Sequence, residues 1–121
     1  MSLTDGLIEG AARRFALLGD PTRLRILHVL MVEGEMAVGV LAKAAGTSRF
    51  NASAHLTRLL ESGFVARRRE GTAIYYRVDD KNLPRVCEWM CDSLRTRART
   101  LARAAERTAT SGLPRLALKK R

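Results

Sequence analysis

The hydrophobic period of this sequence changes at Gly63, and that change limits the possible folds more than any other feature. Before Gly63, apolar residues recur at spacings of three and four, which is typical of helices with one buried face. Residues 64–69 and 73–78 suit β-strands, and residues 70–72 between them are typical of a hairpin turn in which Gly71 supplies a positive φ. The sequence therefore predicts a mainly helical domain that carries a two-stranded β-hairpin.

Turn residues divide the helical part into separate helices. Asp20 is a good N-cap and Pro21 suits the first position of a helix, so a helix starts there. Gly46 ends a shorter helix, and Thr47 or Ser48 caps the next one. A helix, a glycine turn and a second helix form a helix-turn-helix, and the hairpin that follows is typical of a wing. The predicted helices cover about residues 1–18, 21–33, 37–45 and 48–62.

A long final helix is predicted from about Asn82 to Thr110. Its apolar residues form one stripe that is too long for a small winged domain to cover. We expect the same helix of a second copy to cover the stripe, about a two-fold axis, so that the chain is a homodimer. The stripe consists of Leu83, Cys87, Met90, Cys91, Leu94, Ala98, Leu101 and Ala105. Residues 1–110 are thus expected to form a single domain, and residues 111–121 a disordered basic tail.

The charge of the chain indicates the chemistry of its partner. The 121 residues have the length of one domain and a net charge of +10, with the excess in residues 49–77 and 93–121. Such a balance favours a polyanion, either nucleic acid or an acidic membrane surface. The sequence has no run of about 18 apolar residues, so no segment is expected to span a membrane, and its start does not resemble a signal peptide. The last helix places arginines among short apolar residues and lacks a face rich in Trp, Phe or Leu, so we expect no membrane-surface partner. Two cysteines are too few for a disulfide framework, so we expect a cytoplasmic protein.

The helix over residues 48–61 is the best candidate for insertion into a DNA major groove. Arginine can pair with guanine, asparagine with adenine, and serine or threonine with several base edges or a phosphate. The N-terminus of the helix also suits a phosphate oxygen. An ordinary solvated helix face is the alternative. The candidate DNA contacts on this helix are Ser48, Arg49, Asn51, Ser53, His55, Thr57 and Arg58.

Three consecutive arginines, Arg67, Arg68 and Arg69, precede the hairpin turn. They can straddle backbone phosphates or enter a minor groove. Charge that protects an edge strand from pairing is the alternative explanation. The helix and the wing together favour DNA binding over either alternative.

Residues Phe15–Val78 resemble the ArsR/SmtB family of bacterial winged-helix repressors. The resemblance rests on FALLGDPTRLRILHVL and on GEMAVGVLAKAAGTSRFNASAHLTRLLESGFVARRREGTAIYYRV. It implies a winged helix-turn-helix homodimer, with four helices, a two-stranded wing and a last helix in chain order. Such a dimer binds an inverted-repeat operator, represses transcription and is released by an inducer. The family motif SxxxxSxHLxxLxxxGxV is matched by Ser48, Ser53, His55, Leu56, Leu59, Gly63 and Val65. The resemblance assigns base contacts to Arg49, Asn51, Ser53, His55 and Thr57, and wing contacts to Arg68, Arg69 and Thr72.

Of the metal ligands at the two sites known from this family, only Asp80 is present in the sequence. Where relatives that sense arsenic, cadmium or lead have Cys-x-Cys, residues 36–39 read Met-Ala-Val-Gly. Where relatives that sense zinc have Asp-x-His, residues 80–82 read Asp-Lys-Asn, and the later ligand positions hold Ser93 and Thr96. We therefore expect no metal at either site. His28 is expected to lie in the core or at its boundary.

Cys87 and Cys91 lie one helical turn apart on the predicted dimer stripe. They are either two small packing residues or a thiol sensor that responds to oxidants, persulfides or a soft metalloid. Arg85 and Arg95 are near enough in sequence to favour the thiolate, unless they point away.

Other function classes have less support. A winged-helix module that binds protein rather than DNA has no need for Arg49, Asn51 and Ser53 on one face. An enzyme is not expected, because the sequence has no glycine-rich phosphate loop, nucleophile–base pair or carboxylate pair. The arginines of the last helix are either a solvated face or an additional contact to DNA; they are Arg95, Arg97, Arg99, Arg103 and Arg107.

Overall fold

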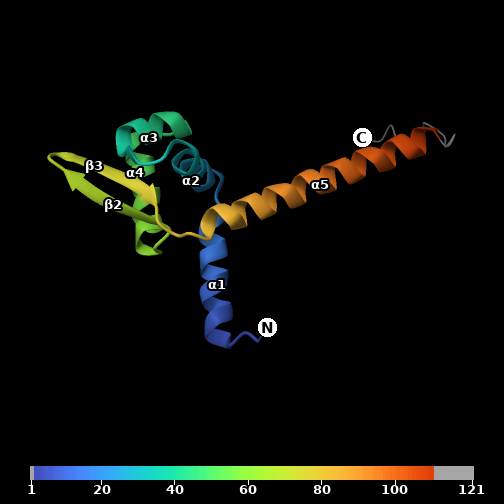
Figure 1. Cartoon of the computed structure of the whole chain (residues 1–121), viewed down its shortest axis with the longest axis horizontal. Helices are drawn as coiled ribbons and strands as arrows, with labels where there is room; N and C mark the ends of the chain where they lie inside the picture. The colour runs from blue at the N-terminus through green and yellow to red at the C-terminus, as the bar shows by residue number, and fades with distance from the viewer. Residues whose placement is uncertain (1, 111–121) are drawn as a thin grey trace. The chain divides into compact units, whose positions relative to one another are not determined.

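The computed structural model describes residues 2–110 (Figure 1). The predicted tail, residues 111–121, lies outside the described residues. The described residues divide into two compact units, residues 2–83 and residues 84–110, which are treated separately. The elements are α1 (Asp5–Leu18), α2 (Pro21–Glu33), β1 (Met36–Ala37), α3 (Val38–Ala45), α4 (Arg49–Glu61), β2 (Val65–Glu70), β3 (Ala73–Val78) and α5 (Leu83–Thr110).

Side-chain caps fix where the helices begin. The Asp20 carboxylate accepts a hydrogen bond from the backbone N–H of Arg23 at 3.0 Å, and Pro21 is the first residue of α2. Ser48, rather than Thr47, caps α4, because the Ser48 hydroxyl accepts from the Asn51 N–H at 3.0 Å. The predicted boundaries of α2 are confirmed, and those of the helix-turn-helix are correct to within about one residue.

The hairpin belongs to a three-stranded antiparallel sheet with the order β1-β3-β2. Strands β2 and β3 pair from Val65 opposite Val78 to Glu70 opposite Ala73, and Gly71 in the turn has a φ of 63°. The sequence did not predict β1. Met36 and Ala37 pair with Tyr76 and Tyr75 of β3, so Ala37 is a strand residue and not the start of the following helix. A two-residue strand has no periodicity of its own and depends on its distant partner.

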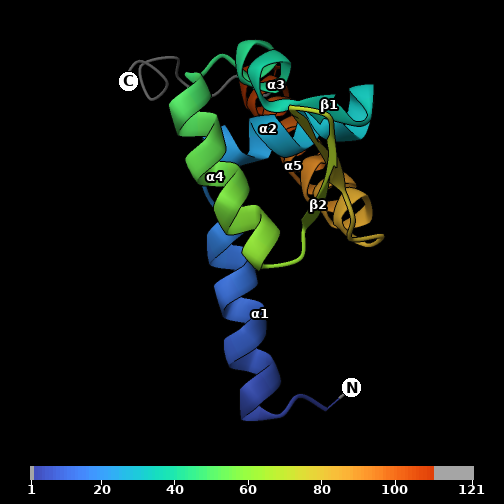
Figure 2. The ribbon, with the colours of Figure 1, turned by 90° about the vertical axis from the view of Figure 1, so that its left-hand side faces the viewer.

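The core of residues 2–83 lies between α2, α3, α4 and the base of the hairpin, which extends away from these helices (Figures 1 and 2). His28 was predicted to lie in the core or at its boundary, but it is exposed. The buried stripe of α2 is narrower than expected and does not reach His28 or Leu24. The buried apolar residues are Ile26, Leu27, Leu30, Leu41, Ala42, Ala45, Ala52, Leu56, Leu59, Phe64, Val65, Tyr76 and Leu83.

Arg14 links helix α1 to residues on both sides of the hairpin. The Arg14 guanidinium donates to the Ser62 carbonyl oxygen at 2.6 Å and to the Asp80 carboxylate at 2.7 Å. It also lies over the Phe64 ring, 4.0 Å from the centroid. No residue of α1 is buried, and Leu7, Ile8 and Phe15 are exposed. Apolar surface on α1 is therefore left uncovered in a single chain.

Helix α5 is amphipathic along its 28 residues. Met90, Leu94 and Leu101 of the predicted stripe are 46%, 63% and 56% exposed. Leu83 differs from them, because it is only 2% exposed and has little surface left for a partner. Arg95 forms an ion pair with Asp92 at 3.0 Å, one turn before it. None of the helices within residues 2–110 is both long enough and apolar enough to cross a membrane.

Candidate nucleic-acid interface

The N-terminus of α4 is held by side chains and leaves backbone donors free. Ser48 accepts from the Asn51 backbone, and the Asn51 side-chain amide donates to the Thr47 hydroxyl at 2.7 Å. The first N–H groups of a helix have no partner within the helix, so those of Arg49 and Phe50 point out of its end. Oriented N–H groups and the partial positive charge of the helix end suit a phosphate oxygen.

The predicted contact residues of α4 lie on its solvent side. Ala52, Leu56 and Leu59 are fully buried and fix the opposite side of the helix against the core. The exposed residues are Ser48, Arg49, Asn51, Thr57 and Arg58, and the half-buried ones are Ser53 and His55. The structure therefore brings these residues together on one helix, with the two half-buried side chains at the margin of its exposed face.

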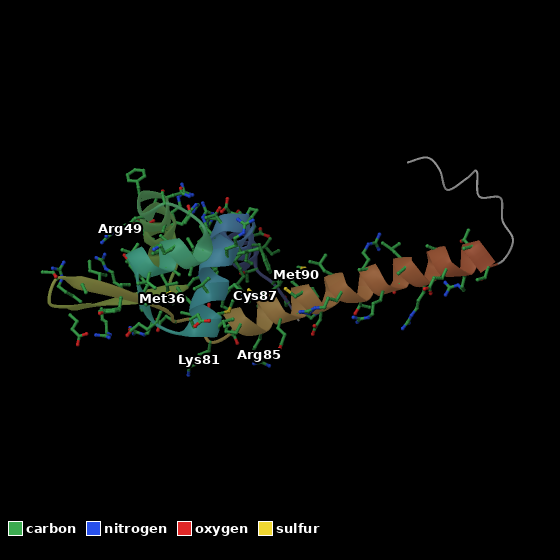
Figure 3. The ribbon with its side chains drawn as sticks, turned by 90° about the horizontal axis from the view of Figure 1, so that it is seen from above. Met36, Arg49, Lys81, Arg85, Cys87 and Met90 are labelled. Carbon is green, nitrogen blue, oxygen red and sulfur yellow. The ribbon has the colours of Figure 1, made fainter. Side chains whose placement is uncertain are left out.

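Arg49 extends from α4 toward the start of α3 (Figure 3). A Cβ atom added at Gly39 of α3 would lie 3.7 Å from Arg49 Nη1. Arg49 forms no ion pair with any residue between 2 and 110, so its charge is available to an external anion.

His55 is held by Arg23 of α2, a residue that sequence reasoning missed. Arg23 Nε donates to His55 Nδ1 at 3.1 Å, and Arg23 Nη1 donates to the Leu17 carbonyl oxygen at 2.9 Å. Because Nδ1 accepts a hydrogen bond in this arrangement, the imidazole proton is assigned to Nε2, which is then the donor available to a ligand. The backbone N–H of Arg23 donates to the Asp20 carboxylate, and this hydrogen bond lowers the pKa of the Asp20 carboxyl.

Two other polar side chains of α4 are partly engaged within the helix. Thr57 donates its hydroxyl proton to the Ser53 carbonyl oxygen at 3.0 Å, which leaves Thr57 only as an acceptor. The Ser48 hydroxyl oxygen serves as the helix cap but keeps its proton. Arg49, Asn51 and Arg58 therefore remain the strongest candidates for contacts to base edges or phosphates on this face.

The three wing arginines lie on different faces of the hairpin. Arg67 is opposite Tyr76 and Arg69 is opposite Ile74, so both lie on the face that reaches the core. Arg68 is opposite Tyr75 on the other face. Arg67 and Arg69 are exposed and have no ion pair within the described part of the chain. Thr72, in the turn, is also exposed.

Arg68 is bound to the protein itself. Its guanidinium lies 2.8 Å from Glu35 Oε1, 3.5 Å from Glu70 Oε1 and 4.7 Å from the Tyr75 ring centroid. The hydrogen bond from Arg68 holds the pKa of the Glu35 carboxyl below its usual range. Arg68 therefore connects the wing to the segment before β1, and its charge is partly neutralised. Sequence reasoning missed Glu35, which lies 33 residues earlier in the chain.

The remaining aspartate of the family's zinc position is part of an ion pair. Asp80 Oδ2 accepts from Arg14, and Asp80 Oδ1 accepts from the Asn82 N–H at 2.8 Å. Between residues 2 and 110, no three His, Cys, Asp or Glu side chains lie close enough together to hold a metal ion. Met36, at the family's thiolate position, is a residue of β1.

Cys87 and Cys91 are free thiols on α5, where Figure 3 labels Cys87 and Met90. Cys87 is half-buried and Cys91 is exposed. Burial raises the pKa of the Cys87 thiol, and the neighbouring Cys91 raises it further. Burial therefore outweighs any effect of Arg85 and Arg95 on the pKa of the Cys87 thiol. A thiol with a raised pKa is a weaker nucleophile at neutral pH, which counts against a reactive sensor at this position.

Similarity to known proteins identifies the family. A helix-turn-helix domain model matches residues 18–68. An uncharacterised helix-turn-helix transcriptional regulator of Methanocaldococcus jannaschii is 42% identical over 74 residues, which are 60% of this chain and 83% of that protein. The solution structure of a homodimeric winged helix-turn-helix DNA-binding domain of a possible ArsR-family regulator from Mycobacterium bovis aligns with a TM-score of 0.71. It is 32% identical and covers 82% of this chain and 94% of that one.

This chain belongs to the ArsR/SmtB family. A cadmium resistance regulatory protein CadC homologue of Staphylococcus aureus is also similar, with 38% identity over 77 residues, 64% of each chain. The ArsR/SmtB chain described here spans less than two thirds of the length of several curated relatives that it matches. The resemblance of Phe15–Val78 to this family is confirmed, as is the winged helix-turn-helix fold.

Proposed function

We propose that two copies of this chain bind an inverted-repeat DNA site and repress transcription until an inducer releases them. The observation that supports this proposal most strongly is the exposed face of α4, where Arg49 and Asn51 lie at a helix end with free N–H groups and Arg58 is exposed in the last turn. In helix-turn-helix proteins the second helix of the motif lies in the major groove, with its N-terminal residues at the base edges. The net charge of +10 favours the same polyanionic partner.

The wing supplies the second contact in this proposal. Arg69 and Thr72 lie near the hairpin tip, and Arg67 shares a face with Arg69. We assign them contacts to phosphates or to the minor groove. We assign Arg68 mainly to holding the wing against Glu35.

Dimer formation is proposed from the uncovered apolar side chains. Leu7, Ile8 and Phe15 of α1 are exposed, as are Met90, Leu94 and Leu101 of α5. The aligned domain from Mycobacterium bovis is homodimeric. We propose that a second copy of this chain covers both sets, with Cys87 and Ala98 on the same stripe of α5. A two-fold dimer presents two copies of α4 to two half-sites about 34 Å apart, one turn of DNA.

The inducer has no assigned binding site in this proposal. The similar Staphylococcus aureus protein is named for cadmium resistance, but here Met36 stands at the family's thiolate position and Asp80 is paired with Arg14. A thiol-based response at Cys87 and Cys91, to an oxidant, a persulfide or a soft metalloid, is the alternative for the signal.

The test of DNA binding starts from a pool of random duplexes, from which the chain selects its own binding sequence. Affinity for the selected duplex is then measured by fluorescence anisotropy for the wild type, Arg49→Ala and Asn51→Ala. A lost bidentate base contact is worth about 1–3 kcal/mol, and a dimer on an inverted repeat loses one in each half-site, so each variant is expected to bind at least about thirtyfold more weakly. The matched control is Arg25→Ala, which removes an exposed arginine from α2.

Two results count against the proposal. If the chain enriches no duplex sequence, it does not read DNA. If Arg25→Ala weakens binding as much as Arg49→Ala, overall charge rather than the face of α4 determines affinity.

A further inference from the structure

Phe50 is the most exposed large apolar side chain in the described part of the chain, at 87%. It is the second residue of α4, between Arg49 and Asn51. Phenylalanine is usually buried, and an exposed aromatic ring on a structured helix often marks a contact with another molecule.

The core of this chain does not use Phe50. Phe50 precedes the buried Leu59 by nine residues, which at about 100° per residue places it on the opposite side of the helix. Ala54, one turn after Phe50, is also exposed. The centre of the solvent face of α4 is therefore apolar, with polar and charged side chains around it.

An apolar group at this position has a specific counterpart in a major groove. The 5-methyl group of thymine is the apolar feature that the major groove presents, and phenylalanine and alanine side chains contact it. The ring of Phe50 has no hydrogen-bond donor or acceptor, so it cannot distinguish bases by hydrogen bonding. The residues on either side, Arg49 and Asn51, supply hydrogen-bonding groups for neighbouring base edges.

We propose that Phe50, with Ala54 one turn later, contacts thymine 5-methyl groups and so selects thymine in each half-site. This inference rests on the proposed DNA binding and adds a specificity-determining contact to it. A protein partner that covers Phe50 is the competing explanation, and the experiment below distinguishes the two.

The test removes the methyl group from the DNA and the ring from the protein. Each thymine of the selected duplex is replaced in turn by deoxyuridine, which lacks only the 5-methyl group. Anisotropy then gives the affinity of the wild type, Phe50→Ala and Phe50→Leu for every duplex. Val32→Ala, which shortens an exposed apolar residue of α2, is the matched control. Circular dichroism and the Tm verify that each variant is folded.

The wild type is expected to bind about fourfold more weakly for each contacted methyl group that is removed. Phe50→Ala is expected to bind the thymine duplex several-fold more weakly and to respond less than the wild type to uracil at those positions. Phe50→Leu, which keeps an apolar side chain, is expected to retain part of the preference. Val32→Ala should behave as the wild type.

Three outcomes overturn the inference. In the first, uracil leaves wild-type affinity unchanged at every position. In the second, uracil weakens the wild type and Phe50→Ala equally, so the methyl group is read elsewhere. In the third, Phe50→Ala binds every duplex as the wild type does. Failure of the proposed function is distinct, because the wild type then selects no duplex at all, and the inference fails with it.

Discussion

Residues 2–83 and helix α5 use apolar side chains in opposite ways. In the first unit, Ile26, Leu27, Leu41, Leu56 and Leu59 are completely buried within one chain. In α5, the large apolar residues after Leu83 remain largely exposed. The helix-turn-helix therefore obtains its stability from its own core, whereas α5 needs a partner to cover its stripe. Substitutions in the two regions should consequently differ in how their effects depend on protein concentration.

The largest expected effect comes from placing charge on the α5 stripe. A buried leucine contributes about 1.5–3 kcal/mol, and an unpaired buried charge costs more. The double substitution Leu94→Glu with Leu101→Glu is expected to raise the Kd for dissociation of the dimer at least about 1000-fold. Sedimentation velocity at micromolar concentration should then show monomers, and affinity for an inverted repeat should fall with dimer formation.

Thr96→Glu is the matched control for this pair, because Thr96 is exposed on α5 outside the stripe. It should leave the dimer intact. A Leu94→Glu, Leu101→Glu chain that still sediments as a dimer would show that another surface joins the two copies.

The second-largest effect is expected on the free energy of unfolding, where a substitution in the core and one on α5 should behave differently. Leu56→Ala removes a completely buried side chain from the core and should lower the free energy of unfolding by about 2–5 kcal/mol. Leu101→Ala should destabilise the chain only through the dimer. Its effect on the free energy of unfolding should therefore be absent where both proteins are monomeric, and should grow to a plateau as protein concentration rises. Equilibrium urea unfolding at several concentrations measures both. If the effect of Leu101→Ala does not depend on protein concentration, a second copy of the chain does not stabilise α5.

A smaller effect is expected at the thiols. Because burial raises the pKa of Cys87, its thiol should stay protonated to a higher pH than a free cysteine, and alkylation should be correspondingly slow. The rate of iodoacetamide modification of a Cys91→Ser chain, followed by mass spectrometry against pH, isolates Cys87. Alkylation of Cys87 at neutral pH faster than that of a cysteine peptide would instead favour the thiol-sensor alternative.

The smallest expected effect concerns the wing. The pKa of Glu35 is lowered by Arg68, so the ion pair contributes fully above the ordinary pKa of a glutamate and is lost as pH falls through the lowered value. Amide exchange in β2 and β3, corrected for the intrinsic effect of pH, should therefore speed up by a few-fold in acid. Glu35→Gln should show this faster exchange at every pH. If the two proteins exchange alike at neutral pH, the Glu35–Arg68 contact does not hold the wing.

Local chemistry made most of the fold predictable. Asp20 with Pro21 predicted the start of α2, and Gly71 predicted the hairpin turn. The exposed face of α4 followed from helical periodicity, because Ala52, Leu56 and Leu59 had to be buried. These features depend on residues that are close in the sequence.

Contacts between distant residues were not predictable. Arg68 was assigned to DNA because three arginines stood together, yet its principal partner is Glu35, 33 residues earlier. Arg23 and His55 are 32 residues apart, so their hydrogen bond required the packing of α2 against α4. Strand β1 is two residues long and exists only because β3 pairs with it. His28 was misplaced because apolar residues beside it made the buried face of α2 look broader than it is.

We propose that the exposed face of α4, rather than the arginine-rich α5, contacts the DNA. The amide chemical shifts of the isotope-labelled chain, recorded as the selected duplex is added, distinguish the two helices. We expect the largest changes at residues 48–58 and in the wing, and smaller changes along residues 95–107. Changes confined to residues 95–107, with α4 unaffected, would show that α5 binds the DNA instead.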